Sequence, residues 1–207
     1  MTNIPPKIIQ HLRTDEKLRV LTETIHLQID YSQKPVFDQL IKSVVSQQLS
    51  TSAAATIYNR FASLLDRQLP SEQAILMLDI DKMRSAGLSA QKAAYIRNIA
   101  EYFSEKKLST IDWNNFTDDE IIRMLTAIKG VGTWTVQMLL MFTLHREDVF
   151  PADDLVIRKS IIQLYGLTSE KKQLTEDLHL VADAWRPYRS IACRYLWAGK
   201  DQINSKL

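Results

Sequence analysis

Cysteine, glycine and proline are scarce in this 207-residue chain, which contains one, five and six of them respectively. The single Cys193 cannot form an internal disulfide, and no cysteine cluster is available for zinc or an iron–sulfur centre. No run of about 18 apolar residues could form a transmembrane helix. The N-terminus, MTNIPPKIIQ, also lacks the basic-then-apolar order of a secretory signal. These absences favour a protein of a reducing cytosol or nucleus.

Charge and histidine content say little about function. A net charge of +2 neither requires nor excludes a nucleic-acid partner. The four histidines have no ligand spacing such as HExxH, so we interpret them as surface or hydrogen-bonded residues. With 45% apolar residues, the composition indicates a compact folded protein and not a disordered one.

Apolar residues recur at three- and four-residue steps along most of the chain, which predicts helices. Pro35 and Pro70-Ser71 are suited to helix starts, and Gly87 to a helix end. Thr117 and Glu120 have the spacing of a capping box. Strand-like alternation is nearly absent, so we predict an all-α protein. The predicted helices lie at about 15–28, 35–45, 51–64, 71–87, 89–104, 117–128, 133–145, 154–165, 174–185 and 187–198.

No low-complexity linker divides the chain, and the loops near 105–117 and 146–153 are the candidate boundaries. We expect a two-lobed helical bundle with a cleft between the lobes. One lobe would span roughly 35–112, and the other would combine 1–34 with 113–207.

The most informative segment is a predicted helical hairpin, LTAIKGVGTWTVQMLLMF, at 125–142. Two glycines around Val131 allow a tight turn, with the valine held in the core. The start of the second helix presents amides that could seat a phosphate, so the hairpin could bind DNA without reading its sequence. An ordinary helical hairpin is the alternative. The turn and these amides belong to Gly130, Val131, Gly132, Thr133 and Trp134.

Asp154 follows Trp134 by 20 residues and opens the predicted helix at 154–165. Taken alone, an aspartate in this place is read as a helix N-cap. Asp153 is the rival, because one-residue slips are a common error in matching a motif. The spacing to Ile157 and Arg158 favours Asp154.

The hairpin and the following DVFPADDLVIRKS resemble the helix-hairpin-helix DNA glycosylase superfamily, and within it the 3-methyladenine DNA glycosylase II branch. The resemblance continues in FDQLIKSVVSQQLSTSAA, MRSAGLSAQKAAYIRNIA and ADAWRPYRSIACRYLW, and covers about 35–200. It implies a DNA-binding cleft and an enzyme that flips alkylated purines of the 3-methyladenine and 7-methylguanine class. The enzyme would hydrolyse their N-glycosidic bond and leave an abasic site. The chain would be a compact form without the N-terminal β domain of longer relatives.

The resemblance also implies roles for single residues. Asp154 would be the catalytic carboxylate, stabilising the oxocarbenium character of the sugar or orienting the attacking water. Trp134, Met138 and Trp197 would line the base pocket, where aromatic rings favour a cationic base. Both tryptophans could instead be ordinary core residues, and Met138 departs from the tyrosine that the family often carries. Trp134 also stands where lyase members of the family carry a lysine, so no Schiff base is expected.

The implied DNA contacts begin with Gln48, the candidate to fill the gap left by the flipped base, with Leu49 second. The glutamines could instead simply end a helix. Further candidates for contact with the opposite strand or phosphates are Ser89, Lys92, Tyr95, Arg186, Arg189 and Arg194, although a solvated basic face would explain the arginines equally well.

No cofactor is expected for the reaction. By resemblance, a structural Na⁺ or K⁺ could be held by main-chain carbonyls near Thr126, Ile128 and Val131. The expected partner is double-stranded DNA with alkylated bases, bound by a monomer without membrane attachment, in the cytoplasm of a bacterium or archaeon or in a eukaryotic nucleus. Two alternatives stay open: a non-catalytic helix-hairpin-helix DNA-binding protein, and the same fold acting on deaminated purines.

Overall fold

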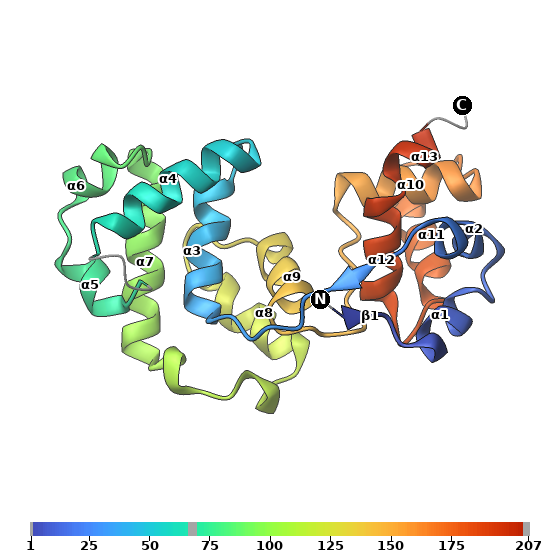
Figure 1. Cartoon of the computed structure of the whole chain (residues 1–207), viewed down its shortest axis with the longest axis horizontal. Coiled ribbons are helices and arrows are strands. Elements are labelled where there is room, and N and C mark those ends of the chain that lie inside the picture. Colours follow the sequence, from blue (N-terminus) through green and yellow to red (C-terminus); the bar gives the residue numbers. More distant parts are fainter. Residues whose placement is uncertain (1, 66–69, 205–207) are drawn as a thin grey trace. The chain divides into compact units, whose positions relative to one another are not determined.

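The structure, a computed structural model that describes residues 2–65 and 70–204, is built almost entirely of helices (Figure 1), as the sequence predicted. The chain forms two compact units. Unit 1 consists of Met1–Ser32 and His145–Leu207, and unit 2 is the continuous segment Gln33–Leu144. No helix in the described part of the chain is long and apolar enough to cross a membrane.

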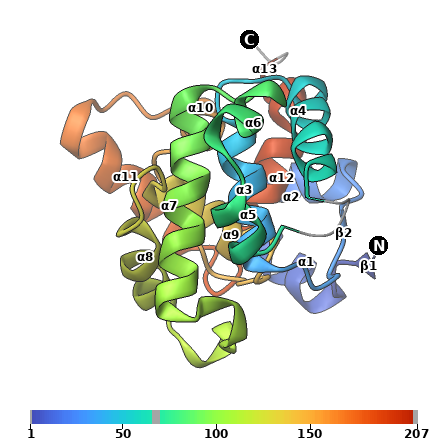
Figure 2. The same ribbon diagram turned by 90° about the vertical axis from the view of Figure 1, so that its left-hand side faces the viewer.

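Unit 2 is organised around one long helix, α7 (Ala90–Lys106), against which α3 and α5 pack (Figure 2). The aromatic rings of Phe37 and Phe103 lie 5.1 Å apart at the centre of this packing. The other helices of unit 2 are α3 (Val36–Ser46), α4 (Thr51–Ser63), α5 (Glu72–Met77), α6 (Ile80–Ser85), α8 (Asp118–Thr126) and α9 (Thr133–Phe142), with short 3-10 helices at Leu108–Thr110 and Trp113–Asn115.

Polar side chains set the starts of these helices. Ser89 accepts a hydrogen bond from the Lys92 amide and caps α7, and Thr117 and Glu120 form the predicted capping box of α8. The stretch predicted as one helix up to Gly87 is two helices, because Asp79 caps α6 and accepts a bond from the Asp81 amide. The preceding Leu78 has extended backbone angles that end α5.

Unit 1 has α12 (Arg189–Ala198) at its centre, packed against α2 and α10 (Figure 1). One carboxylate ties three of its segments together: Asp15 caps α2 and accepts bonds from the Tyr165 hydroxyl at 2.6 Å and the Trp185 indole at 2.9 Å. The remaining elements are α1 (Pro6–Leu12), α2 (Glu16–Thr24), α10 (Leu155–Tyr165), α11 (Lys171–Asp183), α13 (Lys200–Asn204) and an antiparallel pair of two-residue strands, β1 (Thr2–Asn3) and β2 (Gln28–Ile29).

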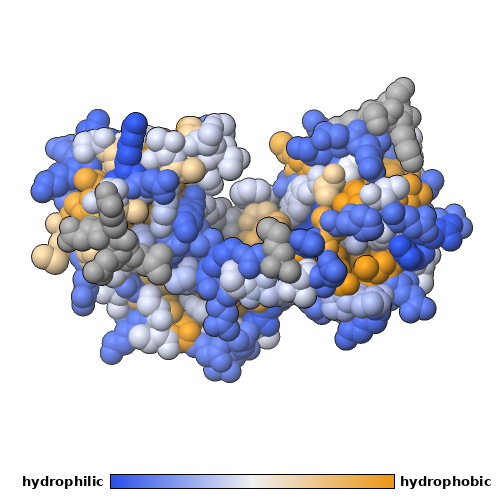
Figure 3. Space-filling model, in the orientation of Figure 1, coloured by the Kyte–Doolittle hydropathy of each residue, from blue (hydrophilic) through white to orange (hydrophobic). Residues whose placement is uncertain are grey.

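The two units do not follow the division near residue 112 that the sequence suggested. Helices α8 and α9 belong to unit 2, because α8 packs against α9 and α9 packs against α3. The predicted loop at 105–117 is therefore a connection inside unit 2, and it contains the two 3-10 helices. On the face shown in Figure 3, both units carry a largely hydrophilic surface interrupted by apolar patches.

Candidate active site

The carboxylate of Asp154 lies at the start of α10, in unit 1. Its Oδ1 accepts hydrogen bonds from the amides of Val156 and Ile157, both at 3.0 Å, so Asp154 is the N-cap of the helix. The same oxygen accepts a third bond, also of 3.0 Å, from the indole N–H of Trp197. The side chain of Asp154 is thus fixed by two helices, α10 and α12, and the residue is only 8% exposed.

Burial separates Asp154 from Asp153, which is exposed. In the described part of the chain only two carboxylate residues, Asp38 and Asp154, are buried. Asp38 forms an ion pair with Lys42 at 2.7 Å, whereas the three donors just described for Asp154 are neutral N–H groups. Its burial and its place at the start of α10 make Asp154, and not the exposed Asp153, the candidate acidic residue of the site.

Cys193 lies one helical turn before Trp197 on α12 and is completely buried. Burial, reinforced by the nearby Asp154 carboxylate, raises the pKa of the Cys193 thiol far above its ordinary value. Because the thiolate and not the thiol is the nucleophile, Cys193 is an inert packing residue.

The loop that leads to Asp154 is held by Arg186, which lies just before α12, and by Arg189 and Ser190 in the first turn of α12. Arg189 donates to the side chain of Asp148 at 2.7 Å and to its carbonyl at 2.7 Å, and Arg186 donates to the same carboxylate at 2.6 Å. The Val149 amide donates to the Ser190 hydroxyl at 2.9 Å. Sequence reasoning treated Arg186 and Arg189 as candidate phosphate ligands, and it did not find Asp148, whose partners are about 40 residues away.

The hairpin of unit 2 has the predicted form, with α8 ending at Thr126 and α9 beginning at Thr133. Gly130 has a φ of +104°, and a Cβ atom there would lie only 2.2 Å from Cγ of Tyr95. Gly132 is the N-cap of α9 with an ordinary φ of −95° and open space around it. Only the first glycine is therefore required by the turn.

Helix α7 holds this hairpin turn in place. The ring of Tyr95 packs on Gly130, and the side-chain amide of Asn98 donates to the Lys129 carbonyl at 3.1 Å. Val131 is buried, as predicted, whereas Gly132 and Thr133 are exposed at the start of α9. Trp134 is 45% exposed at the second position of α9. The exposed helix start is suited to an anion, because its first amides lack intrahelical acceptors.

The turn between α3 and α4 carries the predicted inserting residues Gln48 and Leu49, both exposed. Gln48 has a φ of +58°, in the left-handed region that few non-glycine residues adopt. Lys92, predicted as a DNA contact, donates to the main-chain carbonyls of Val45, in the last turn of α3, and of Gln47. Ser89 lies at the cap of the helix that carries Lys92.

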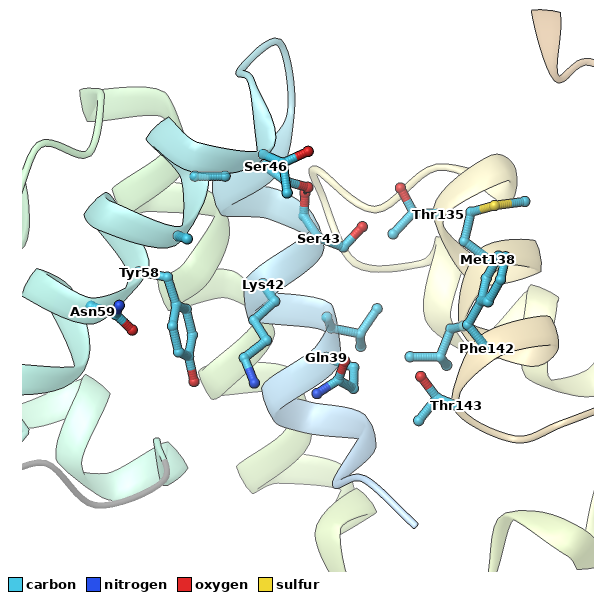
Figure 4. Close-up of a pocket in the computed structure, with 15 residues that line it drawn as sticks. Gln39, Lys42, Ser43, Ser46, Tyr58, Asn59, Thr135, Met138, Phe142 and Thr143 are labelled. Carbon is cyan, nitrogen blue, oxygen red and sulfur yellow. The ribbon is translucent and has the colours of Figure 1, made fainter. Parts of the chain in front are cut away.

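A groove of about 540 Å³ lies between α3, α4 and α9, inside unit 2 (Figure 4). Met138 and Phe142 form its apolar wall on α9, and α3 contributes Gln39, Lys42 and Ser43. Its lining combines these apolar side chains with polar groups from α3 and α4. Met138, one of the predicted base-pocket residues, therefore lines a groove, while Trp197 contacts the buried carboxylate of unit 1.

The carbonyls of Thr126, Ile128 and Val131, predicted to hold a monovalent ion, lie at and after the C-terminal end of α8. The Ile128 carbonyl accepts the Val131 amide at 3.0 Å, which closes the turn. Carbonyl oxygens are ligands for hard cations, and the C-terminus of a helix carries partial negative charge. The type of atom and the local charge here are therefore those that a monovalent cation needs. In the described part of the chain, no group of three or more His, Cys, Asp or Glu side chains could hold a metal ion.

Comparison with known proteins gives one family. Residues 41–183, more than half of the chain, match the model of the HhH-GPD superfamily base excision DNA repair protein. A Schizosaccharomyces pombe protein named DNA-3-methyladenine glycosylase 1 is 39% identical over 166 residues, which cover 79% of this chain and 72% of that protein.

Two similar solved structures cover nearly the whole chain. A DNA-3-methyladenine glycosidase from Bacillus halodurans is 30% identical with a TM-score of 0.84, over 99% of this chain and 95% of the other. The S. pombe 3-methyladenine DNA glycosylase Mag1, solved in complex with abasic DNA, is 35% identical with a TM-score of 0.80, over 94% and 97%.

Proposed function

Because the chain belongs to the HhH-GPD superfamily of base excision DNA repair proteins, we propose that it is a monofunctional DNA-3-methyladenine glycosylase. It removes alkylated purines, of the 3-methyladenine and 7-methylguanine class, from duplex DNA and leaves an abasic site. The single observation that carries this proposal is the buried Asp154 carboxylate at the start of α10, in a chain that also has the helical hairpin.

Asp154 supplies the negative charge that the reaction needs. When the N-glycosidic bond breaks, its electron pair leaves with the base and positive charge develops on the deoxyribose. A carboxylate beside that carbon stabilises this charge, orients the water whose oxygen bonds to C1′, and accepts the proton that the water loses. The three bonds to Oδ1 fix the carboxylate before the substrate arrives, which lowers the cost of reorganisation during the reaction.

Trp134 determines the type of product. A lyase needs an amine that attacks the sugar and forms a Schiff base, and the position after Gly-Val-Gly-Thr here holds an indole. Hydrolysis is therefore the only outcome, and the abasic strand is not cut. The alkylated base itself needs little acid assistance, because its positive charge already weakens the bond to the sugar.

In unit 2 we assign Trp134 and Met138 to contact with the base, and in unit 1 we assign Trp197 to the positioning of Asp154. The exposed Gln48 or Leu49 fills the gap in the duplex, and the amides of Gly132 and Thr133 bind a phosphate. The enzyme needs no cofactor and binds double-stranded DNA as a monomer. The monovalent ion at the hairpin stays a prediction, and in this role it would neutralise phosphate charge without entering the chemistry.

The test is base release from methylated duplex DNA, resolved by chromatography, with wild type, Asp154→Asn and Asp153→Asn. We expect wild type and Asp153→Asn to release 3-methyladenine, and Asp154→Asn to lose at least about 100-fold in single-turnover rate. Asparagine also serves as an N-cap, so Asp154→Asn should melt close to wild type and the loss can be assigned to the missing charge.

Three results would change the proposal. Release that persists in both variants would remove Asp154 and Asp153 from the mechanism. Release of hypoxanthine from a deaminated duplex, with no base released from methylated DNA, would change the proposed substrates from alkylated to deaminated purines. Tight binding to any duplex with no product from folded wild type would support the non-catalytic DNA-binding alternative.

A further inference from the structure

The ammonium group of Lys92 is directed at the end of helix α3. Its Nζ donates to the carbonyl of Val45 at 2.8 Å and to the carbonyl of Gln47 at 2.7 Å. The last carbonyls of a helix lack intrahelical partners, and Val45 and Gln47 lie at this helix end. Lys92 comes from the first turn of α7, 45 residues further along the chain, so its contact is a tertiary cap of α3.

The turn that Lys92 reaches is the one that exposes Gln48 and Leu49. Gln48 holds a left-handed φ of +58°, and such a conformation persists in a non-glycine residue only when its surroundings impose it. Inside the turn, the Leu49 amide donates to the Ser46 carbonyl at 3.1 Å. Both carbonyls that Lys92 holds, those of Val45 and Gln47, lie on the N-terminal side of Gln48, so the lysine fixes the backbone that leads into the turn.

The same turn is joined to the hairpin. The side-chain amide of Gln47 reaches the Gly130 carbonyl at 3.5 Å, and Gly130 is the glycine on which Tyr95 packs. Lys92 and Tyr95 lie three residues apart on α7, so one face of this helix supports both the turn and the hairpin.

A phosphate contact would need Lys92 to point into solvent. An ammonium has three N–H bonds, and two of them are directed at carbonyls at short distances. Partial burial lowers the pKa of Lys92, as expected for an ammonium group partly withdrawn from water. Lys92 therefore differs from a basic residue whose ammonium group points only into solvent, because two of its donors are directed at main-chain carbonyls.

We propose that Lys92 is a positioning residue that sets the conformation of the α3–α4 turn, so that Gln48 or Leu49 is preorganised to enter the duplex. That this turn enters DNA rests on the proposed function, whereas the positioning of the turn by Lys92 rests on the two bonds to main-chain carbonyls. Lys92 acts through the turn and makes no contact with the DNA backbone.

The first experiment needs no DNA. Hydrogen exchange followed by mass spectrometry is compared for wild type, Lys92→Met and the control Lys82→Met, in a peptide that spans the turn. Methionine keeps the length and packing of the side chain but removes the donors, and Lys82 is an exposed lysine of the same unit. We expect the Leu49 amide to exchange at least about tenfold faster in Lys92→Met and unchanged in Lys82→Met. Unchanged exchange in Lys92→Met would overturn the proposal, whether or not the protein is a glycosylase.

The second experiment separates positioning from phosphate binding. Single-turnover base release and affinity for an abasic-site duplex are measured over a range of salt concentrations. We expect Lys92→Met to lose roughly tenfold in the single-turnover rate, with affinity changed by less than about threefold and the salt slope of binding unchanged. A slope reduced by about one unit would identify Lys92 as a phosphate ligand and overturn the proposal.

Lys92→Arg serves as the rescue variant, because a guanidinium also donates several hydrogen bonds. We expect it to restore slow exchange of the Leu49 amide and most of the rate. If the melting curve shows that Lys92→Met does not fold, hydrogen exchange and single-turnover base release are measured for Lys92→Arg and Lys92→Gln instead. Exchange and rate that are equal in all Lys92 variants would refute the role. Absence of release by wild type would refute only the proposed function.

Discussion

The two glycines of the hairpin should differ widely in how much stability they lose on substitution by alanine. Gly130 has a φ of +104°, and the Cβ atom added in Gly130→Ala would lie 2.2 Å from Cγ and 2.6 Å from both Cδ atoms of Tyr95. Ordinary contacts between carbon atoms are about 3.5–4.0 Å long, so the Tyr95 ring would have to move by more than about 1 Å. Gly132 has an ordinary φ, and nothing lies within 4 Å of its Cβ position.

The size of the effect follows from two terms. A non-glycine residue at positive φ costs about 1–3 kcal/mol, and forcing a packed ring aside costs about 1–3 kcal/mol more. We therefore expect Gly130→Ala to lower the free energy of unfolding by about 2–6 kcal/mol, which at about 2–4 °C per kcal/mol shifts the melting temperature of a chain of this size by roughly 4–24 °C. In Gly132→Ala, the loss from a poorer N-cap and the gain from a less flexible unfolded chain nearly cancel. The free energy of unfolding should therefore change by less than about 1 kcal/mol.

Urea denaturation of both variants measures this difference, and a double-mutant cycle separates the two terms. In Tyr95→Ala the ring is gone, so adding Gly130→Ala should cost only the backbone term, with a coupling energy of about 1–3 kcal/mol between the positions. Equal losses with and without the ring would show that the overlap carries no energy. A Gly130→Ala protein as stable as wild type would refute the whole reasoning.

Two further variants test other parts of the structure. Trp197→Phe removes the indole N–H that donates to Oδ1 of Asp154, a hydrogen bond worth about 1.5–3 kcal/mol when the acceptor is charged. Single-turnover base release should therefore fall roughly 10- to 100-fold, with little change in DNA affinity. Weaker affinity with an unchanged rate would indicate that Trp197 binds the base instead. Lys107→Gly relieves the left-handed C-cap of α7, where φ is +53°, and should raise the free energy of unfolding by about 0.5–1 kcal/mol in a denaturation experiment; a lower value would contradict this assignment.

Local chemistry explains which helices could be predicted from the sequence. The capping box at Thr117 and the serine before Ala90 act on amides within three residues, so their effect is visible in the order of residues. The break at Asp79 was missed because apolar periodicity continues across it. The short helix α1 (Pro6–Leu12) and the two-residue strands are too brief for a periodic pattern to appear.

Long-range contacts mark the limit of sequence reasoning about the site. The residue types of Lys92 and Arg189 suggested phosphate contacts, and the folded chain directs both at acceptors more than 40 residues away. Nothing in the neighbouring sequence distinguishes a lysine that binds carbonyls from one that binds phosphate. The catalytic assignment of Asp154, the base-pocket residues and the inserting side chain accordingly stay predictions that the variants above can test.

Asp154 shows why an N-cap aspartate is hard to interpret from sequence and informative in a structure. A helix cap needs only a short side chain with an acceptor, and Ser, Thr and Asn meet that need as well as Asp. Capping therefore explains neither the choice of a carboxylate nor the third donor from Trp197, which comes from another helix and adds nothing to the cap itself. Burying a charge carries a desolvation penalty that a neutral cap would avoid. The burial of Asp154 and its bond from Trp197, a residue of another helix, are therefore the features that distinguish it from an ordinary cap, and Asp154→Asn tests whether its charge acts in base release.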